Sequence, residues 1–133
     1  MSILGRQVPG SVVAFVAVVL VVGALLPVMT KTQPVDREIT LVTHNMRFYV
    51  DGDRTNPNPV IEVKRGERVR IVLKNTERGM THDFAVPAFG AKTSLVDWNE
   101  QDDMTFTAPA EPGTYEYICN PHLLMMKGLI KVV

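Results

Sequence analysis

Short stretches of alternating hydrophobic and polar residues fill the chain after residue 37. In residues 68–73, Val69, Ile71 and Leu73 share one parity and arginines occupy much of the other. Alternation with a period of two is typical of a β-strand with one buried face. Clusters of Gly, Pro, Asn and Asp separate such stretches and favour turns. The strand-sized segments are residues 39–50, 60–63, 68–73, 82–86, 104–107, 114–119 and 129–133.

This spacing of strands and turns indicates the fold class. Seven or eight short strands are typical of an all-β Greek-key sandwich or barrel. Residues 64–67, Lys-Arg-Gly-Glu, separate two predicted strands, and we expect a hairpin connection there. After residue 30 no segment has the length and 3.6-residue period of a clear helix, although residues 92–101 are ambiguous.

The hydrophobic pattern is different near the N-terminus. Residues 12–29 contain only Val, Ala, Leu, Phe, Gly, Pro and Met. As a helix, this run would extend about 27 Å, close to the roughly 30 Å of a bilayer core. A cleaved signal peptide is the alternative, but residues 25–30, Leu-Leu-Pro-Val-Met-Thr, make a poor cleavage site. We therefore expect a single transmembrane signal-anchor.

The anchor divides the chain into four parts. These are a short tail at residues 1–11, the transmembrane signal-anchor at 12–29, a polar linker at 30–37 and a β domain at 38–133. The simplest orientation keeps the tail inside and places the domain on the extracytoplasmic side, which is periplasmic or extracellular. Few flanking charges bear on this orientation.

Charge and cysteine content exclude several classes of protein. Residues 36–133 carry 12 basic and 14 acidic side chains, a net charge of −2. This balance argues against a nucleic-acid partner. Cys119 is the only cysteine, so an intrachain disulfide is impossible. An unpaired cysteine outside the cytoplasm needs a protected role, either as a metal ligand or as a small buried side chain.

Candidate chemistry is concentrated around that cysteine. Residues 119–126 contain Cys119, His122, Met125 and Met126. Thiolate, imidazole and thioether are ligands that select copper over oxygen-preferring cations. A trigonal copper site needs a second histidine, and only His44 and His82 remain as candidates.

Strand parity predicts where two of these side chains point. Cys119 shares a face with Tyr117, and His82 shares a face with Phe84, so both should point inward. The alternative for His82 is a core histidine bonded to a backbone carbonyl. For His122 it is an exposed loop position, and for either methionine it is core filling.

Several motifs in order resemble the cupredoxins, the family of small blue-copper electron carriers that includes plastocyanin-like and amicyanin-like proteins. The motifs lie at residues 60–75, 81–84 (Thr-His-Asp-Phe), 106–119 and 126–132, and the resemblance covers residues 38–133. It implies one mononuclear copper ion, with His82, Cys119 and His122 as ligands. Cys-x-x-His matches the members of the family with a short ligand loop.

The resemblance leaves two candidates for the axial thioether ligand. Counting from His122 in the amicyanin-like loop selects Met125, whereas counting back two residues from Gly128 selects Met126. We favour Met126, because the strand after Gly128 should fix the end of the loop. His44 as an additional ligand would resemble the red-copper protein nitrosocyanin. Asp83 and Asn120 are candidates to orient the imidazoles.

The resemblance implies electron transfer rather than catalysis. We expect a type 1 copper protein that shuttles single electrons between membrane or periplasmic redox partners, which would dock near His122, Leu123 and Leu124. A copper oxidase needs a second, histidine-rich site, which three histidines do not supply. The alternatives are an accessory cupredoxin subunit of a larger membrane oxidase complex and a non-redox copper-binding or delivery module.

Overall fold

The computed structural model describes residues 32–133. The expected transmembrane signal-anchor at residues 12–29 lies outside these residues. Within residues 32–133, no helix is long and apolar enough to cross a membrane. Residues Pro34–Val133 form one structural unit, and the rest of the description concerns that unit.

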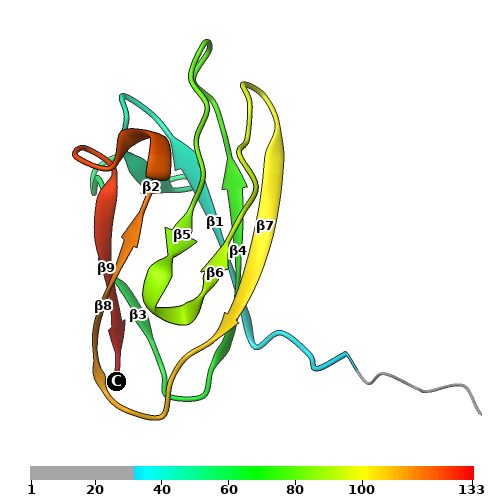
Figure 1. The fold of residues 1–133 in the computed structure, drawn as a ribbon, viewed down its shortest axis with the longest axis vertical. Coiled ribbons are helices and arrows are strands. Elements are labelled where there is room, and N and C mark those ends of the chain that lie inside the picture. Colours follow the sequence, from blue (N-terminus) through cyan, green and yellow to red (C-terminus); the bar gives the residue numbers. More distant parts are fainter. Residues whose placement is uncertain (1–31) are drawn as a thin grey trace, which may run out of the picture. The chain divides into compact units, whose positions relative to one another are not determined.

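Residues 32–133 form nine β-strands and two short 3-10 helices, and they contain no α-helix, so the all-β prediction is confirmed (Figure 1). The elements are β1 (Arg37–Thr43), β2 (Phe48–Val50), β3 (Ile61–Val63), β4 (Arg68–Lys74), β5 (Ala85–Val86), η2 (Pro87–Phe89), β6 (Ala91–Lys92), β7 (Gln101–Thr107), β8 (Gly113–Ile118), η3 (Asn120–His122) and β9 (Lys127–Val132). One sheet has the order β2-β1-β4-β7 and the other has the order β3-β9-β8-β5-β6.

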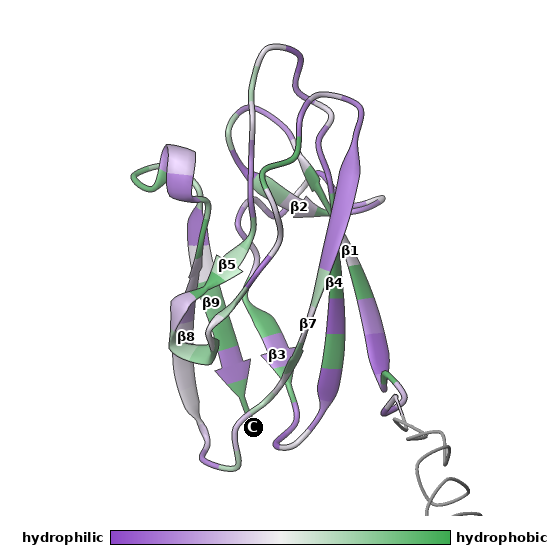
Figure 2. Cartoon of the chain, turned by 45° about the vertical axis from the view of Figure 1, so that its right-hand side comes forward, coloured by the Kyte–Doolittle hydropathy of each residue, from purple (hydrophilic) through white to green (hydrophobic). Residues whose placement is uncertain are grey.

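The core is built from the inward faces of the two sheets. On β4, Val69, Ile71 and Leu73 are fully buried, as their parity predicts, and Figure 2 shows the alternation along this strand. The rings of Phe84 and Tyr117 stack with centroids 4.9 Å apart. These apolar contacts make a rigid support beneath the loops at one end of the sheets.

The hairpin predicted at residues 64–67 is wrong. Residues 64–67 form a tight turn, closed by Glu67 N–H donating to the Lys64 carbonyl over 3.0 Å, but β3 and β4 belong to different sheets. β4 pairs with β1 and β7, whereas β3 pairs in parallel with β9. Alternation identifies strands but not their partners, because long-range packing decides the pairing.

Residues 39–50 are likewise not one strand. The backbone turns between β1 and β2, where Asn45 and Met46 have φ of 47° and 53°. His44 and Arg47 exchange two backbone hydrogen bonds of 3.0 Å across this turn. A two-residue turn with two positive φ angles matches the twist of a hairpin. The turn also places His44 outside both strands.

Gly128 on β9 faces the ring of Tyr117 on β8. A Cβ atom at this position would lie 2.3 Å from the tyrosine oxygen. The Tyr117 hydroxyl donates a 2.7 Å hydrogen bond to the Pro59 carbonyl, so the ring cannot easily withdraw. Glycine is therefore required here for space, and this fixes the position at which the segment after Cys119 joins β9.

Candidate metal centre

Three potential metal ligands come from two loops at one end of the sheets. Cys119 directly follows β8, and His122 is the last residue of η3. His82 precedes β5 and is held by a β-bridge, in which its N–H donates to the Val96 carbonyl and its carbonyl accepts from the Val96 N–H. The expected strand at residues 82–86 is thus reduced to this bridge and the two residues of β5.

The side chains of these three residues converge. Cys119 Sγ lies 3.7 Å from His82 Nδ1 and 3.7 Å from His122 Nδ1. The two imidazole centroids are 4.8 Å apart. His82 and Cys119 are fully buried and His122 is partly exposed. Within residues 32–133, His82, Cys119 and His122 form the single group of this kind that could hold a metal ion.

The spacing of the donor atoms fits one ion. Three ligands roughly 2.1 Å from a metal in a trigonal plane would be about 3.6 Å apart. This value is close to the two sulfur–nitrogen distances. Two imidazoles and a thiolate, with a thioether nearby, are also the donor set of trigonal copper sites.

The segment from Cys119 to Met126 is closed by its own backbone. Cys119 N–H donates to the Met126 carbonyl over 2.9 Å, and Met126 N–H donates to the His122 carbonyl over 2.9 Å. Pro121 lies in the first turn of η3, where its missing N–H is not needed. These bonds hold Cys119 and His122 at a fixed separation.

The two adjacent methionines have different environments. Met126 is fully buried within the core cluster that also contains Cys119, whereas 44% of Met125 is exposed. The Met125 carbonyl accepts hydrogen bonds from Arg47 Nη1 at 3.2 Å and from Asn58 Nδ2 at 3.0 Å. Of the two thioethers, that of Met126 is therefore the one enclosed with the cysteine.

His44 lies apart from this group. Its side chain is exposed, and its ring meets Tyr49 edge-on with centroids 6.2 Å apart.

Asp83 and Asn120 are joined by two hydrogen bonds. Asp83 oxygens accept from the Asn120 backbone N–H at 2.6 Å and from its Nδ2 at 2.8 Å. Asp83 directly follows His82, and Asn120 directly follows Cys119. These two hydrogen bonds therefore hold the two ligand-bearing segments side by side.

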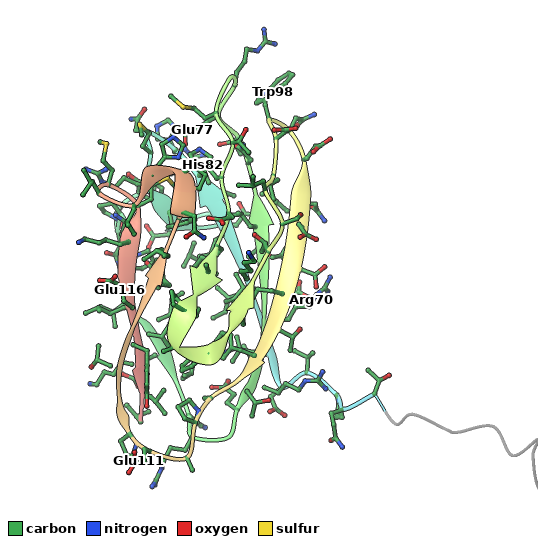
Figure 3. All side chains as sticks on the ribbon, viewed as in Figure 1. Arg70, Glu77, His82, Trp98, Glu111 and Glu116 are labelled. Atoms are coloured by element: carbon green, nitrogen blue, oxygen red, sulfur yellow. The ribbon has the colours of Figure 1, made fainter. Side chains whose placement is uncertain are left out.

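Sequence reasoning missed Glu77, which contacts the far side of His82. Glu77 Oε2 lies 2.8 Å from His82 Nε2. Both residues are labelled in Figure 3. The spacing of Glu77 and His82 matches no strand period, because residues 75–81 form an irregular loop. Asn75 fixes this loop through bonds from its Nδ2 to the carbonyls of Met80 and Val96.

Burial shifts the protonation equilibria of two of the potential ligands. It lowers the pKa of His82, and the nearby His122 lowers it further, while Glu77 and Asp83 oppose the shift. Burial also raises the pKa of the Cys119 thiol, against backbone N–H groups of Asp83 and His122 that lower it. The metal-free site thus favours a neutral imidazole and a neutral thiol.

The shift at His82 predicts how the stability of the metal-free protein depends on pH. Below about pH 6.5 an unfolded histidine binds a proton that the folded His82 resists, so stability should fall as pH falls through this value. Urea unfolding between pH 7.5 and 5.5 measures this loss. His82→Gln should flatten the slope and the exposed-site control His44→Gln should not. An unchanged slope in His82→Gln would contradict the assignment.

The comparisons with known proteins agree with this fold. A family model described as a cupredoxin-like domain matches residues 14–132. No curated protein sequence gives a match. Among solved structures, auracyanin B superposes with a TM-score of 0.60 at 19% identity, covering 77% of this chain and 92% of that one.

Two further solved structures have a similar fold. Auracyanin A, a "blue" copper protein from Chloroflexus aurantiacus, has a TM-score of 0.55 and 24% identity, covering 72% of this chain and 98% of that one. Rusticyanin from Thiobacillus ferrooxidans has a TM-score of 0.54 and 23% identity, covering 72% of this chain and 76% of that one. At these identities the likeness shows a shared fold.

Proposed function

From the premise that this chain belongs to the family of cupredoxin-like domains, we propose that it is a type 1 copper protein that carries single electrons between redox partners. The observation that carries the proposal is the position of Cys119 Sγ, 3.7 Å from one nitrogen of each of two imidazoles. Auracyanin A, a "blue" copper protein, and rusticyanin have the same fold.

The proposed ligands are His82, Cys119, His122 and Met126. The first three form the convergent group, and the burial of Met126 beside Cys119 supports its choice over Met125 as the axial thioether. A bound copper ion would supply the one-electron couple, since two imidazoles, a thiolate and a weak thioether suit both Cu(I) and Cu(II).

The protein's own contribution is rigidity and exclusion of water. The bridge to Val96 holds His82, and the backbone bonds between Cys119 and Met126 hold the second loop. Cys119, His82 and Met126 are fully buried, so water does not reach them. A site that keeps its geometry in both oxidation states needs little rearrangement when an electron arrives or leaves, which favours rapid transfer.

We further propose that redox partners dock around His122, whose imidazole is the only one of the two that reaches the surface. Beside it, Leu123, Leu124 and Met125 expose 47%, 90% and 44% of their surfaces. Transient redox contacts are small, so an apolar patch of this kind is sufficient.

Electron self-exchange between oxidised and reduced copies, measured by NMR line broadening, tests this docking surface. Leu124→Lys should slow the exchange at least about tenfold, because like charges would meet in the encounter complex. Leu129→Lys, at a leucine with 41% exposure on β9, is the matched control and should have little effect. Equal effects of the two variants would remove the patch from the proposal.

Titration of the metal-free protein with Cu(II) tests the proposed function itself. A thiolate-coordinated Cu(II) ion in this site should give an intense visible band with one ion per chain. A folded protein that binds Cu(II) without this band would support a non-redox copper-binding role. Failure to bind copper would remove the function altogether.

We also propose that residues 12–29 anchor the protein, with its cupredoxin domain on the extracytoplasmic side. The support is the apolar run of 18 residues in the sequence. The protein should stay with membranes through high-salt and carbonate washes. Recovery of a soluble form that begins near Lys31 would show a cleaved signal peptide instead.

A further inference from the structure

Glu77 links a strained turn to the buried imidazole of His82. Glu77 Oε1 accepts a 2.9 Å hydrogen bond from the Met46 N–H, and Oε2 lies 2.8 Å from His82 Nε2. The side chain of Glu77 is only 14% exposed. A carboxylate therefore lies directly behind an imidazole whose other nitrogen faces the Cys119 sulfur.

The contact between Glu77 and His82 is an exclusive one. Oε2 and Nε2 are both buried, and neither has a hydrogen-bond partner elsewhere among residues 32–133. Their contact departs from the geometry of an ideal hydrogen bond, so it is better described as a short contact between a carboxylate and an imidazole. Each of these two buried polar atoms therefore depends on the other for its polar contact.

The arrangement determines which imidazole nitrogen carries the proton. An ionised carboxylate can only accept hydrogen bonds, and a neutral imidazole has one donor and one acceptor nitrogen. Nε2, which faces Glu77, is therefore the donor. Nδ1, which lies 3.7 Å from the Cys119 sulfur, then keeps a free lone pair, as a ligand nitrogen requires.

The other partner of Glu77 is held by an unusual backbone. Met46 has a φ of 53°, in a region that residues other than glycine seldom adopt. In this conformation its N–H donates to Glu77, and the adjacent Arg47 reaches the Met125 carbonyl of the second loop. Strain that persists next to a functional group points to a role for the strained residue.

We propose that Glu77 is a positioning residue of the metal centre, which fixes the tautomer of His82 and places a carboxylate behind it. The proposal rests on the proposed function, since it concerns His82 as a copper ligand. A carboxylate behind a metal-bound histidine increases the basicity of that ligand. A negative charge at this place stabilises Cu(II) more than Cu(I), so Glu77 lowers the reduction potential.

Replacement of Glu77 by glutamine gives a sharp test. Glutamine has the same shape, but it has one acceptor oxygen for the two donors that Glu77 satisfies. The Glu77→Gln protein should show a higher reduction potential, with about a tenfold change in the ratio of Cu(I) to Cu(II) affinity, or about 59 mV. Glu77→Asp keeps the charge and should lie between Glu77→Gln and the wild type.

The matched control removes one negative charge at the opposite end of the sheets. Figure 3 shows Glu111 far from Glu77 and His82, and its side chain is exposed. Glu111→Gln should leave the potential within a few millivolts of the wild type. Equal shifts in Glu77→Gln and Glu111→Gln, or no shift in either, would overturn the role of Glu77.

A second measurement needs neither copper nor a variant. In the metal-free wild-type protein at neutral pH, long-range ¹⁵N NMR correlations distinguish the two tautomers of His82. A proton on Nε2 supports the proposal, and a proton on Nδ1 overturns it. Because this measurement is independent of copper, a protein that fails to form the blue site would refute the proposed function while the tautomer still decides the role of Glu77.

Discussion

Copper-loaded Cys119→Ser protein should lack the intense visible band of the wild type completely. The band arises from charge transfer between a thiolate and Cu(II), and serine supplies no sulfur. Its hydroxyl is also a harder donor that is not readily deprotonated, so affinity for copper should fall as well. Absorption spectroscopy during titration with Cu(II) measures both effects.

The design separates loss of the ligand from loss of the fold. Serine differs from cysteine by one atom, and Cys119 is fully buried, so circular dichroism should show an intact β domain. The control is Leu124→Ser, in the same loop at a side chain with 90% exposure. It should keep the band. A band that survives in Cys119→Ser would exclude Cys119 as the source of the colour.

Met126→Leu should raise the reduction potential by about 59 mV or more, a tenfold or larger change in the ratio of Cu(I) to Cu(II) affinity. Leucine fills a similar volume in the core but cannot act as a ligand. Three trigonal ligands satisfy Cu(I), whereas Cu(II) gains more from a fourth donor, so removing that donor should favour Cu(I). Met125→Leu is the matched control, because Met125 is adjacent in the loop and largely outside the core.

The comparison of the two methionine variants has a definite alternative outcome. A larger shift in Met125→Leu than in Met126→Leu would assign the axial position to Met125. Equal small shifts would mean that neither thioether contacts the metal. Protein-film voltammetry on both variants at one pH and salt concentration distinguishes these results.

The burial of His82 and Cys119 was predictable from the apolar residues around them, although His82 lies outside the strand that was expected for it. The preference for Met126 rests on counting back from Gly128. The structure gives a physical reason to treat Gly128 as a fixed position. Since the Tyr117 ring excludes any Cβ atom at Gly128, this position cannot slide along the neighbouring strand. The length of the loop between Cys119 and Gly128 is thereby fixed.

Other features depend on contacts that local sequence does not encode. The role of Glu77 requires the turn at Met46, about 30 residues earlier, to supply a backbone donor. The positive φ angles of Asn45 and Met46 occur without the glycine that normally marks such a turn. The pairing of β3 with β9 rather than with β4 likewise depends on residues far apart in the sequence.

The position of β9 within its sheet has a consequence for the synthesis of the protein. β9 lies between β3 and β8, so it pairs with strands on both sides although it is the latest of the described strands in the chain. A nascent chain that ends before Lys127 cannot complete this sheet, whatever its earlier strands do. The domain should therefore complete its fold only after Val132 has emerged from the ribosome, since an interior position in this sheet is filled last.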